Sequence, residues 1–96
     1  KWPQIPGFAD HRALLASGTV DAVLIATPHY DHTTIGIDAL AAGVHTLVEK
    51  PLSVHKADCQ RLIAAYEGRK RKDLVFAEMF NQRTDDYYRK IRALIR

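Results

Sequence analysis

A glutamate and a lysine stand side by side where an apolar stretch ends, at Glu49 and Lys50 in the run VHTLVEKP of residues 44–51. Such apolar runs are typical of buried strands in parallel sheets, and ligands collect at the carboxyl ends of those strands. Pro51 has no amide N–H and disfavours a helical conformation before it, so we expect Lys50 to be extended and presented. A presented lysine can act as a general acid or base if its ordinary pKa of about 10.4 is lowered.

Two other apolar runs, residues 22–26 and 74–80, also end in polar residues. These residues are Thr27, Pro28 and His29 after the first run, and Asn81, Gln82 and Arg83 after the second. If the three strands are parallel and adjacent, all three ends lie along one edge of the sheet. Ligand crevices in open α/β sheets form at that edge. The sequence therefore predicts a site there before any family is considered.

Helical patterns flank the first apolar run. Asp10 is expected to cap a short helix over residues 11–16. Residues 22–26 (AVLIA) are apolar without alternation, which is typical of a strand covered on both faces. The helix that follows is expected to begin near Asp31 and to end at Gly43.

Two further helices are predicted downstream. Ser53 is expected to cap the first of them, which ends at Gly68. Thr84 or Asp85 is expected to cap the second, whose apolar residues repeat at helical spacing and should face inward. These inward residues are Tyr87, Tyr88, Ile91, Leu94 and Ile95.

The alternation of strands with helices predicts an α/β fold with a parallel sheet, right-handed crossovers and three layers. The chain has 96 residues, of which 47% are hydrophobic and 26% charged, as in soluble globular proteins. No apolar run approaches the roughly 20 residues needed to cross a bilayer, so no membrane partner is predicted.

The basic charge balance, +3 at neutral pH, allows an anionic partner. A basic loop at residues 69–72 accounts for much of the excess, and without a wider basic face or stacking aromatics we predict no nucleic-acid partner. His29 and His32 with Asp31 fall short of a zinc spacing, so no metal is predicted. The single cysteine, Cys59, cannot form an internal disulfide and favours a reducing, cytoplasmic compartment.

Several of these segments, in this order, resemble one family of oxidoreductases. Thr27-Pro28, His32, the stretch ALAAG at 39–43 and Glu49-Lys50-Pro51 are similar to the glucose-fructose oxidoreductase and inositol dehydrogenase family, Gfo/Idh/MocA. The resemblance covers nearly the whole chain. It implies a Rossmann fold for NAD or NADP, of which residues 1–96 would be the second mononucleotide-binding half, strands four to six.

The rest of such a protein is not recognisable in the sequence. No G-x-G-x-x-G turn occurs, and no acidic residue can be assigned to the ribose hydroxyls, so the pyrophosphate cradle of the first half is missing. The family's C-terminal substrate domain is also missing. We therefore expect a partial NAD(P)-binding domain that is inactive by itself.

The resemblance also assigns site residues. Lys50 would be the catalytic lysine, which contacts the substrate hydroxyl and helps to relay its proton. The residues matching the cofactor-binding positions are Thr27, Pro28, His32, Glu49, Lys50, Pro51, Asn81, Gln82 and Arg83.

The expected activity of the parent protein is hydride transfer between the nicotinamide of NAD or NADP and a sugar, a cyclitol or a related polyol. A homo-oligomer is expected for the full-length protein. The alternative is a non-catalytic module that keeps the half-fold to sense a nucleotide or to contact another protein.

Overall fold

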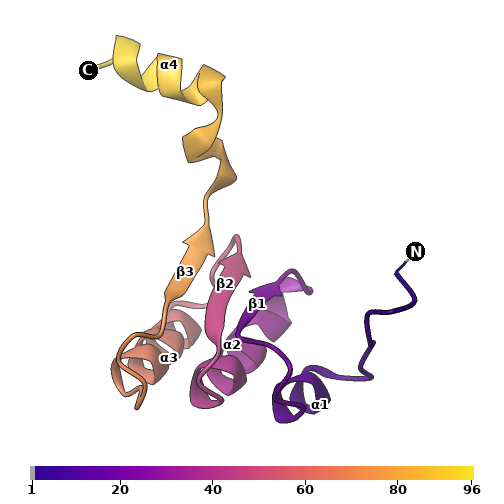
Figure 1. Cartoon of the computed structure of the whole chain (residues 1–96). Helices are drawn as coiled ribbons and strands as arrows, with labels where there is room; N and C mark the ends of the chain where they lie inside the picture. The colour runs from indigo at the N-terminus through magenta and orange to yellow at the C-terminus, as the bar shows by residue number, and fades with distance from the viewer. Residues whose placement is uncertain (1) are drawn as a thin grey trace.

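The computed structural model describes residues 2–96, in which strands and helices alternate as predicted (Figure 1). Two 3-10 turns, η1 (His29–Asp31) and η2 (Asn81–Thr84), precede the second and fourth helices. The regular elements are α1 (His11–Ala16), β1 (Ala22–Ile25), α2 (His32–Ala41), β2 (His45–Glu49), α3 (Lys56–Glu67), β3 (Phe76–Met79) and α4 (Asp86–Leu94).

The strands form one parallel sheet in the order β1-β2-β3. Ile25 pairs with Val48 at the end of β1, and Glu49 pairs with Met79 at the end of β3. The three strands therefore end at nearly the same level, and the arrowheads in Figure 1 point to one edge of the sheet. This arrangement confirms the predicted parallel α/β architecture.

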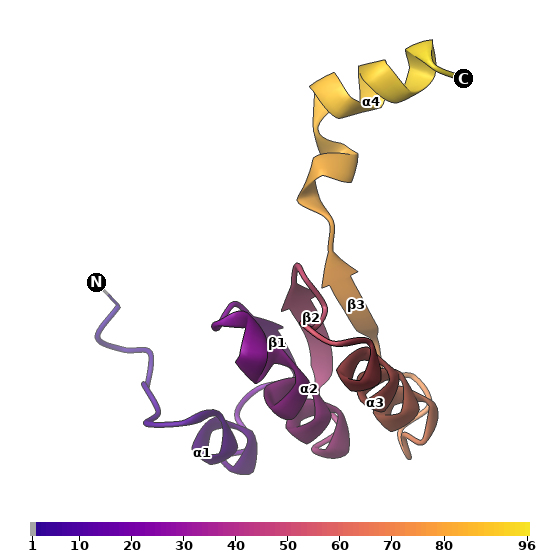
Figure 2. The same ribbon diagram turned by 180° about the vertical axis from the view of Figure 1, so that it is seen from behind.

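Helices α2 and α3 pack against the same face of the sheet (Figure 2). Alternate residues of β2 are buried on that face, with Thr46 at 2% exposure and Val48 at 0%. Leu40 of α2 and Leu62 of α3 complete the core from the helical side. The apolar face of each helix is thus buried between the two layers.

Gly36 allows α2 and α3 to approach closely. A Cβ atom at this position would lie 2.6 Å from Cδ2 of Leu62, which is closer than side chains pack. Leu62 is fully buried and occupies the space that the glycine leaves. The contact between the two helices is therefore built around one large side chain on α3.

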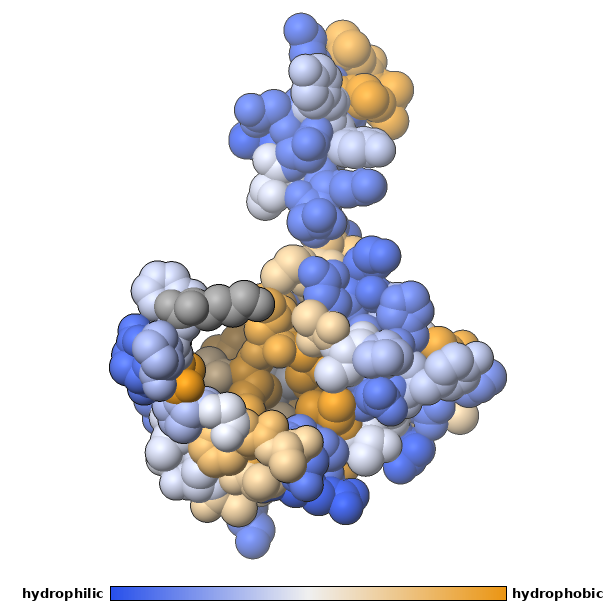
Figure 3. All heavy atoms as spheres, turned by 90° about the vertical axis from the view of Figure 1, so that its right-hand side faces the viewer, coloured by the Kyte–Doolittle hydropathy of each residue, from blue (hydrophilic) through white to orange (hydrophobic). Residues whose placement is uncertain are grey.

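The other face of the sheet is open within the described residues. Leu24 of β1 is 56% exposed, whereas its neighbour Ile25 is buried. The expected cover on both faces of residues 22–26 is found on one face only, because the described helices pack on the side of α2. A cavity of about 190 Å³ lies at the free edge of β1, with Leu14 and Leu15 of α1 and Ala39 of α2 in its lining, and Figure 3 shows apolar side chains in a hollow at this edge.

Helix ends follow the predicted residues in most cases. Asp10 accepts a hydrogen bond from the Ala13 amide, 2.8 Å away. Asp85 caps α4 by accepting from the amides of Tyr87 and Tyr88. Gly43 has a φ of 74°, a left-handed conformation that suits glycine after a helix.

The start of α3 was predicted wrongly. The helix begins at Lys56, two residues beyond the start that a Ser53 cap implies, and its N-cap is His55, which makes no side-chain cap bond. The Ser53 hydroxyl instead pairs with the hydroxyl of Thr33 on α2 at 2.8 Å. A tertiary partner thus replaces the local backbone amide that a cap would have bound.

The inward orientation predicted for the last helix is also wrong in the described chain. Helix α4 extends away from the sheet (Figure 1), and η2 is the element against which it mainly packs. Its apolar positions are 51–82% exposed, because no other element lies against them. These residues are Tyr87, Tyr88, Ile91, Leu94 and Ile95.

Polar side chains tie α1 to α2. Asp38 of α2 lies 2.7 Å from Nε2 of His11 and accepts a bond of 3.1 Å from Nε of Arg12. The hydrogen bond from His11 is the main cause that lowers the pKa of Asp38 from its usual 3.8, burial opposes it, and Arg12 adds to the lowering. None of the helices in residues 2–96 combines the length and apolar composition that a membrane span requires.

We expect Leu62→Ala to lower the free energy of unfolding by about 2–5 kcal/mol, because it leaves a cavity between α2 and α3. Urea unfolding would measure the change. Ile63→Ala is the matched control on the same helix, and since Ile63 is 48% exposed it should cost less than about 1 kcal/mol. Equal losses in the two variants would contradict this description of the core.

We expect Asp38→Asn to destabilise the protein by a few tenths of a kcal/mol near neutral pH, as partly exposed ion pairs do. A carboxyl whose pKa is lowered by folding stabilises the folded state above its unfolded pKa and loses this contribution as the pH falls through its folded pKa. The difference between wild type and variant should therefore shrink as the pH falls below 3.8. Urea unfolding over this range would test it, and a pH-independent difference would be the contrary result.

Candidate active site

A hollow of about 360 Å³ lies at the carboxyl edge of the sheet, where the predicted site was placed. It is bounded by the exits of β1 and β2. The lining residues are Ala26, Thr27, His29, His32, Glu49 and Lys50. Two strand ends that are far apart in the sequence thus meet in one hollow.

Lys50 is presented at this edge as the sequence predicted. It follows the last residue of β2 directly and is exposed. Its backbone amide donates to Oε2 of Glu49 at 3.1 Å, and its ammonium group forms no salt bridge within residues 2–96. The peptide bond from Lys50 to Pro51 is cis. The ammonium group is therefore available to a ligand in the hollow.

His32 lies behind the hollow and is fully buried. Its Nδ1 is 2.8 Å from the carbonyl oxygen of Pro51, and its Nε2 is 3.1 Å from the carbonyl oxygen of Thr27. A neutral imidazole has one N–H and can donate to one of these carbonyls at a time, whereas a protonated ring donates to both. Either way, both ring nitrogens are directed at backbone, and the ring joins the exit of β1 to the loop that follows Lys50.

The amino end of α2 holds this loop at a second point. Thr33, the next residue along α2, is buried and shares a hydrogen bond with Ser53. The ring of His32 also meets His29 edge to face, with centroids 5.7 Å apart. Consecutive residues of α2 therefore hold the loop after Lys50 at Pro51 and at Ser53.

The exit of β3 does not join this hollow. Asn81, Gln82 and Arg83 form the turn η2 and are exposed. Gln82 and Arg83 line a different cavity, which they share with α4. Pro28 also lies outside the lining, where its carbonyl accepts from the Asp31 amide at 3.0 Å. Of the predicted site residues, the structure brings together Thr27, His32, Glu49 and Lys50.

His29 lines the hollow although the sequence assigned it no ligand contact. Its position directly after Thr27-Pro28 at a strand exit was the available signal. In the part of the chain that the structure describes, no group of three or more His, Cys, Asp or Glu side chains could hold a metal ion. His29 thus forms part of the wall of the hollow at the sheet edge.

The hollow suits part of a dinucleotide. Its volume of about 360 Å³ is near the lower end of the range for small-molecule pockets, roughly 300–1,000 Å³. A nicotinamide with its ribose can fit such a space, and the remainder of the cofactor would extend beyond it. Exposed Thr27 and Lys50 supply polar groups to its lining.

Known proteins are similar to this chain in sequence and in fold. A family model described as an oxidoreductase family with an NAD-binding Rossmann fold matches residues 1–78. An inositol 2-dehydrogenase of Leifsonia xyli is 34% identical over 93 residues, which cover 97% of this chain and 27% of that protein. The myo-inositol 2-dehydrogenase of Thermotoga maritima is 32% identical over 88 residues, covering 92% of this chain and 25% of that protein.

A solved structure is also similar to this chain in sequence and in fold. The chain is similar to UDP-N-acetylglucosamine 3-dehydrogenase from Acidithiobacillus ferrooxidans, with 32% identity and a TM-score of 0.77. The match covers 95% of this chain and 29% of that one. The chain therefore spans about a quarter of the length of the curated relatives that it matches.

We expect His32→Ala to lower the free energy of unfolding by about 2–4 kcal/mol, because it leaves a cavity at a fully buried side chain and removes a hydrogen-bond partner of the Thr27 and Pro51 carbonyls. His29→Ala removes the neighbouring, exposed imidazole and should change stability by less than about 0.5 kcal/mol. Urea unfolding of both variants would measure this. If the two losses were alike, His32 would not hold the edge together.

Proposed function

Because the chain belongs to the Gfo/Idh/MocA family of oxidoreductases with an NAD-binding Rossmann fold, we propose that it holds the nicotinamide end of NAD or NADP beside a catalytic lysine. The observation that carries this proposal is the exposed Lys50 at the carboxyl edge of the sheet, in one hollow with Thr27 and Glu49. The parent protein would transfer a hydride between the nicotinamide and a sugar, a cyclitol or a related polyol. Its inositol dehydrogenase relatives support that substrate class.

Residues 1–96 would form the second half of the nucleotide-binding domain. The lack of a G-x-G-x-x-G turn in the sequence supports this, as does the edge position of β1, which leaves one side of the sheet free for further strands. The pyrophosphate and adenosine parts of the cofactor would then be bound by another part of the protein. This half alone would not turn over substrate.

The roles of the residues follow from their places. Thr27 and Pro28 would lie beside the nicotinamide ribose, and Glu49 near the nicotinamide ring. Lys50 would accept the hydroxyl proton of the substrate during oxidation and return it during reduction. The bound nicotinamide supplies the hydride chemistry itself.

The residues around the lysine would position it. His32 and Pro51 set the backbone that carries Lys50, through the hydrogen bond at 2.8 Å. Asn81, Gln82 and Arg83 would contact cofactor or substrate from η2, as a separate segment. We also propose that the full-length protein is a cytoplasmic homo-oligomer.

We expect Lys50→Ala, in the full-length protein, to lower kcat by roughly a hundredfold or more, since general acid–base groups contribute about 10²–10⁴. Affinity for NADH, followed by its fluorescence, should change little. Lys56→Ala is the matched control, because Lys56 is an exposed lysine at the start of α3.

Two results would contradict the proposal in different ways. If the full-length protein bound neither NADH nor NADPH, the assignment of a cofactor site would fail. If it bound cofactor while Lys50→Ala left turnover unchanged, the lysine would have no catalytic role. Binding without turnover in the wild-type protein would favour a nucleotide sensor over an enzyme.

A further inference from the structure

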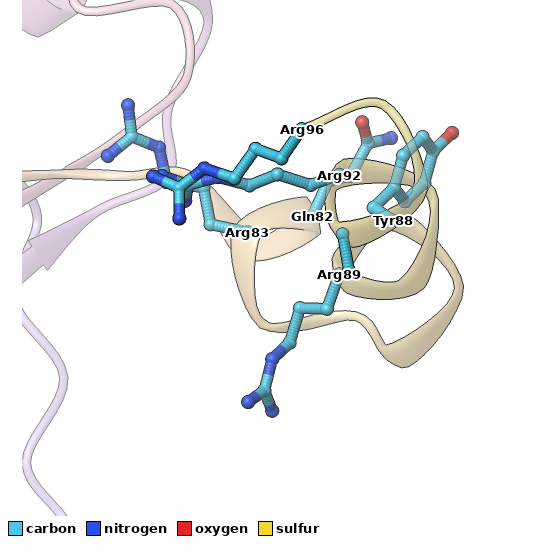
Figure 4. Close-up of a pocket in the computed structure, with 7 residues that line it drawn as sticks. Gln82, Arg83, Tyr88, Arg89, Arg92 and Arg96 are labelled. Atoms are coloured by element: carbon cyan, nitrogen blue, oxygen red, sulfur yellow. The ribbon is translucent and has the colours of Figure 1, made fainter.

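Helix α4 and the turn η2 enclose a second hollow, of about 680 Å³ and open to solvent (Figure 4). It is lined by side chains of one charge sign. The lining residues are Gln82, Arg83, Tyr88, Arg89, Arg92, Ala93 and Arg96. The lining residues of the described chain thus include four arginines and no acidic residue.

Three of these arginines are directed together. In Figure 4 the guanidinium groups of Arg83, Arg92 and Arg96 extend in the same direction, and that of Arg89 points elsewhere. Arg92 lies in the last turn of α4, and Arg96 lies two residues beyond the end of the helix. The turn η2 brings Arg83 alongside them.

These three guanidinium groups have no counter-ion in the described part of the chain. Arg89 pairs with Asp86 at 3.8 Å, and Asp85 is engaged in capping α4. None of the salt bridges within residues 2–96 includes Arg83, Arg92 or Arg96, and the guanidinium carbon of Arg83 lies over the ring of Phe80, 5.3 Å from its centroid. Like charges in close proximity repel, and an anion between them would relieve that repulsion.

We propose that this hollow binds the diphosphate group of a small molecule. The planar fork of a guanidinium matches phosphate oxygens with two parallel hydrogen bonds, so three forks can bind a group with several negative charges. Tyr88 and Gln82 also line the hollow, but in Figure 4 their polar ends lie away from the three guanidinium groups, so the arginines alone would bind the diphosphate. The space is larger than an inorganic anion needs, which suits a diphosphate attached to an organic group.

The diphosphate could belong to a dinucleotide or to a nucleotide-linked sugar. The site stands apart from the hollow at Lys50 and does not depend on hydride transfer there. Calorimetric titration of the 96-residue chain at low salt with inorganic pyrophosphate is the first test, and NAD and UDP-glucose are the arms that distinguish the two sources. We expect saturable binding of pyrophosphate.

The double variant Arg92→Gln with Arg96→Gln should weaken pyrophosphate binding about tenfold or more. Lys90→Gln is the matched control: it removes one positive charge from α4, outside the lining of the hollow, and should change affinity less than about twofold. Helix content by circular dichroism shows whether α4 persists. Replacement of both arginines by lysine keeps the charge and should still weaken binding, because the fork is lost.

Four results would overturn the proposal. The first is no saturable binding of pyrophosphate to the wild-type chain. The second is equal weakening by Lys90→Gln and by either single glutamine variant at Arg92 or Arg96. The third is unchanged affinity in the double lysine variant with α4 intact. The fourth is tighter binding of a single-stranded oligonucleotide than of pyrophosphate, which would assign the surface to a polymer.

Discussion

Parallel pairing of β2 with a strand on each side is the constraint from which the arrangement of the molecule follows. Both crossovers must return over the sheet, and since each takes the same hand, α2 and α3 pack on the same face. The pairing also sets the level of the strand ends, because Ile25 lies opposite Val48 and Glu49 opposite Met79. The hollow at Lys50 exists because these registers leave two polar exits side by side.

The sequence predicted those features that depend on local chemistry. Asp10 and Asp85 cap their helices through amides two or three residues away, and Gly43 takes a backbone conformation that other residues avoid. Short apolar runs identified the strands for the same reason, since burial between layers requires apolar side chains. The start of α3 was misplaced because Ser53 finds a hydroxyl on another helix, and no local pattern records that partner.

The candidate site also combines features that local sequence predicts with features that depend on tertiary contacts. The exposed position of Lys50 could be predicted, because it depends only on a strand end and the proline that follows. The hydrogen bonds of His32 could not, since they join it to carbonyls 5 and 19 residues away in the sequence. Periodicity in α4 indicated a helix with an apolar side, but periodicity cannot say whether another element covers that side.

His32 and Lys50 have different roles at the carboxyl edge, and this difference has a consequence for evolution. The side chain that shapes the carboxyl edge is buried and bonded to backbone, whereas the one displayed there takes part in no side-chain hydrogen bond or salt bridge of the described chain. A mutation at the displayed position removes no hydrogen bond or salt bridge of its side chain in the described chain. Substitutions of Lys50 can therefore change the chemistry at this edge during evolution. His32 is under a different constraint, which comes from the fold and not from the reaction.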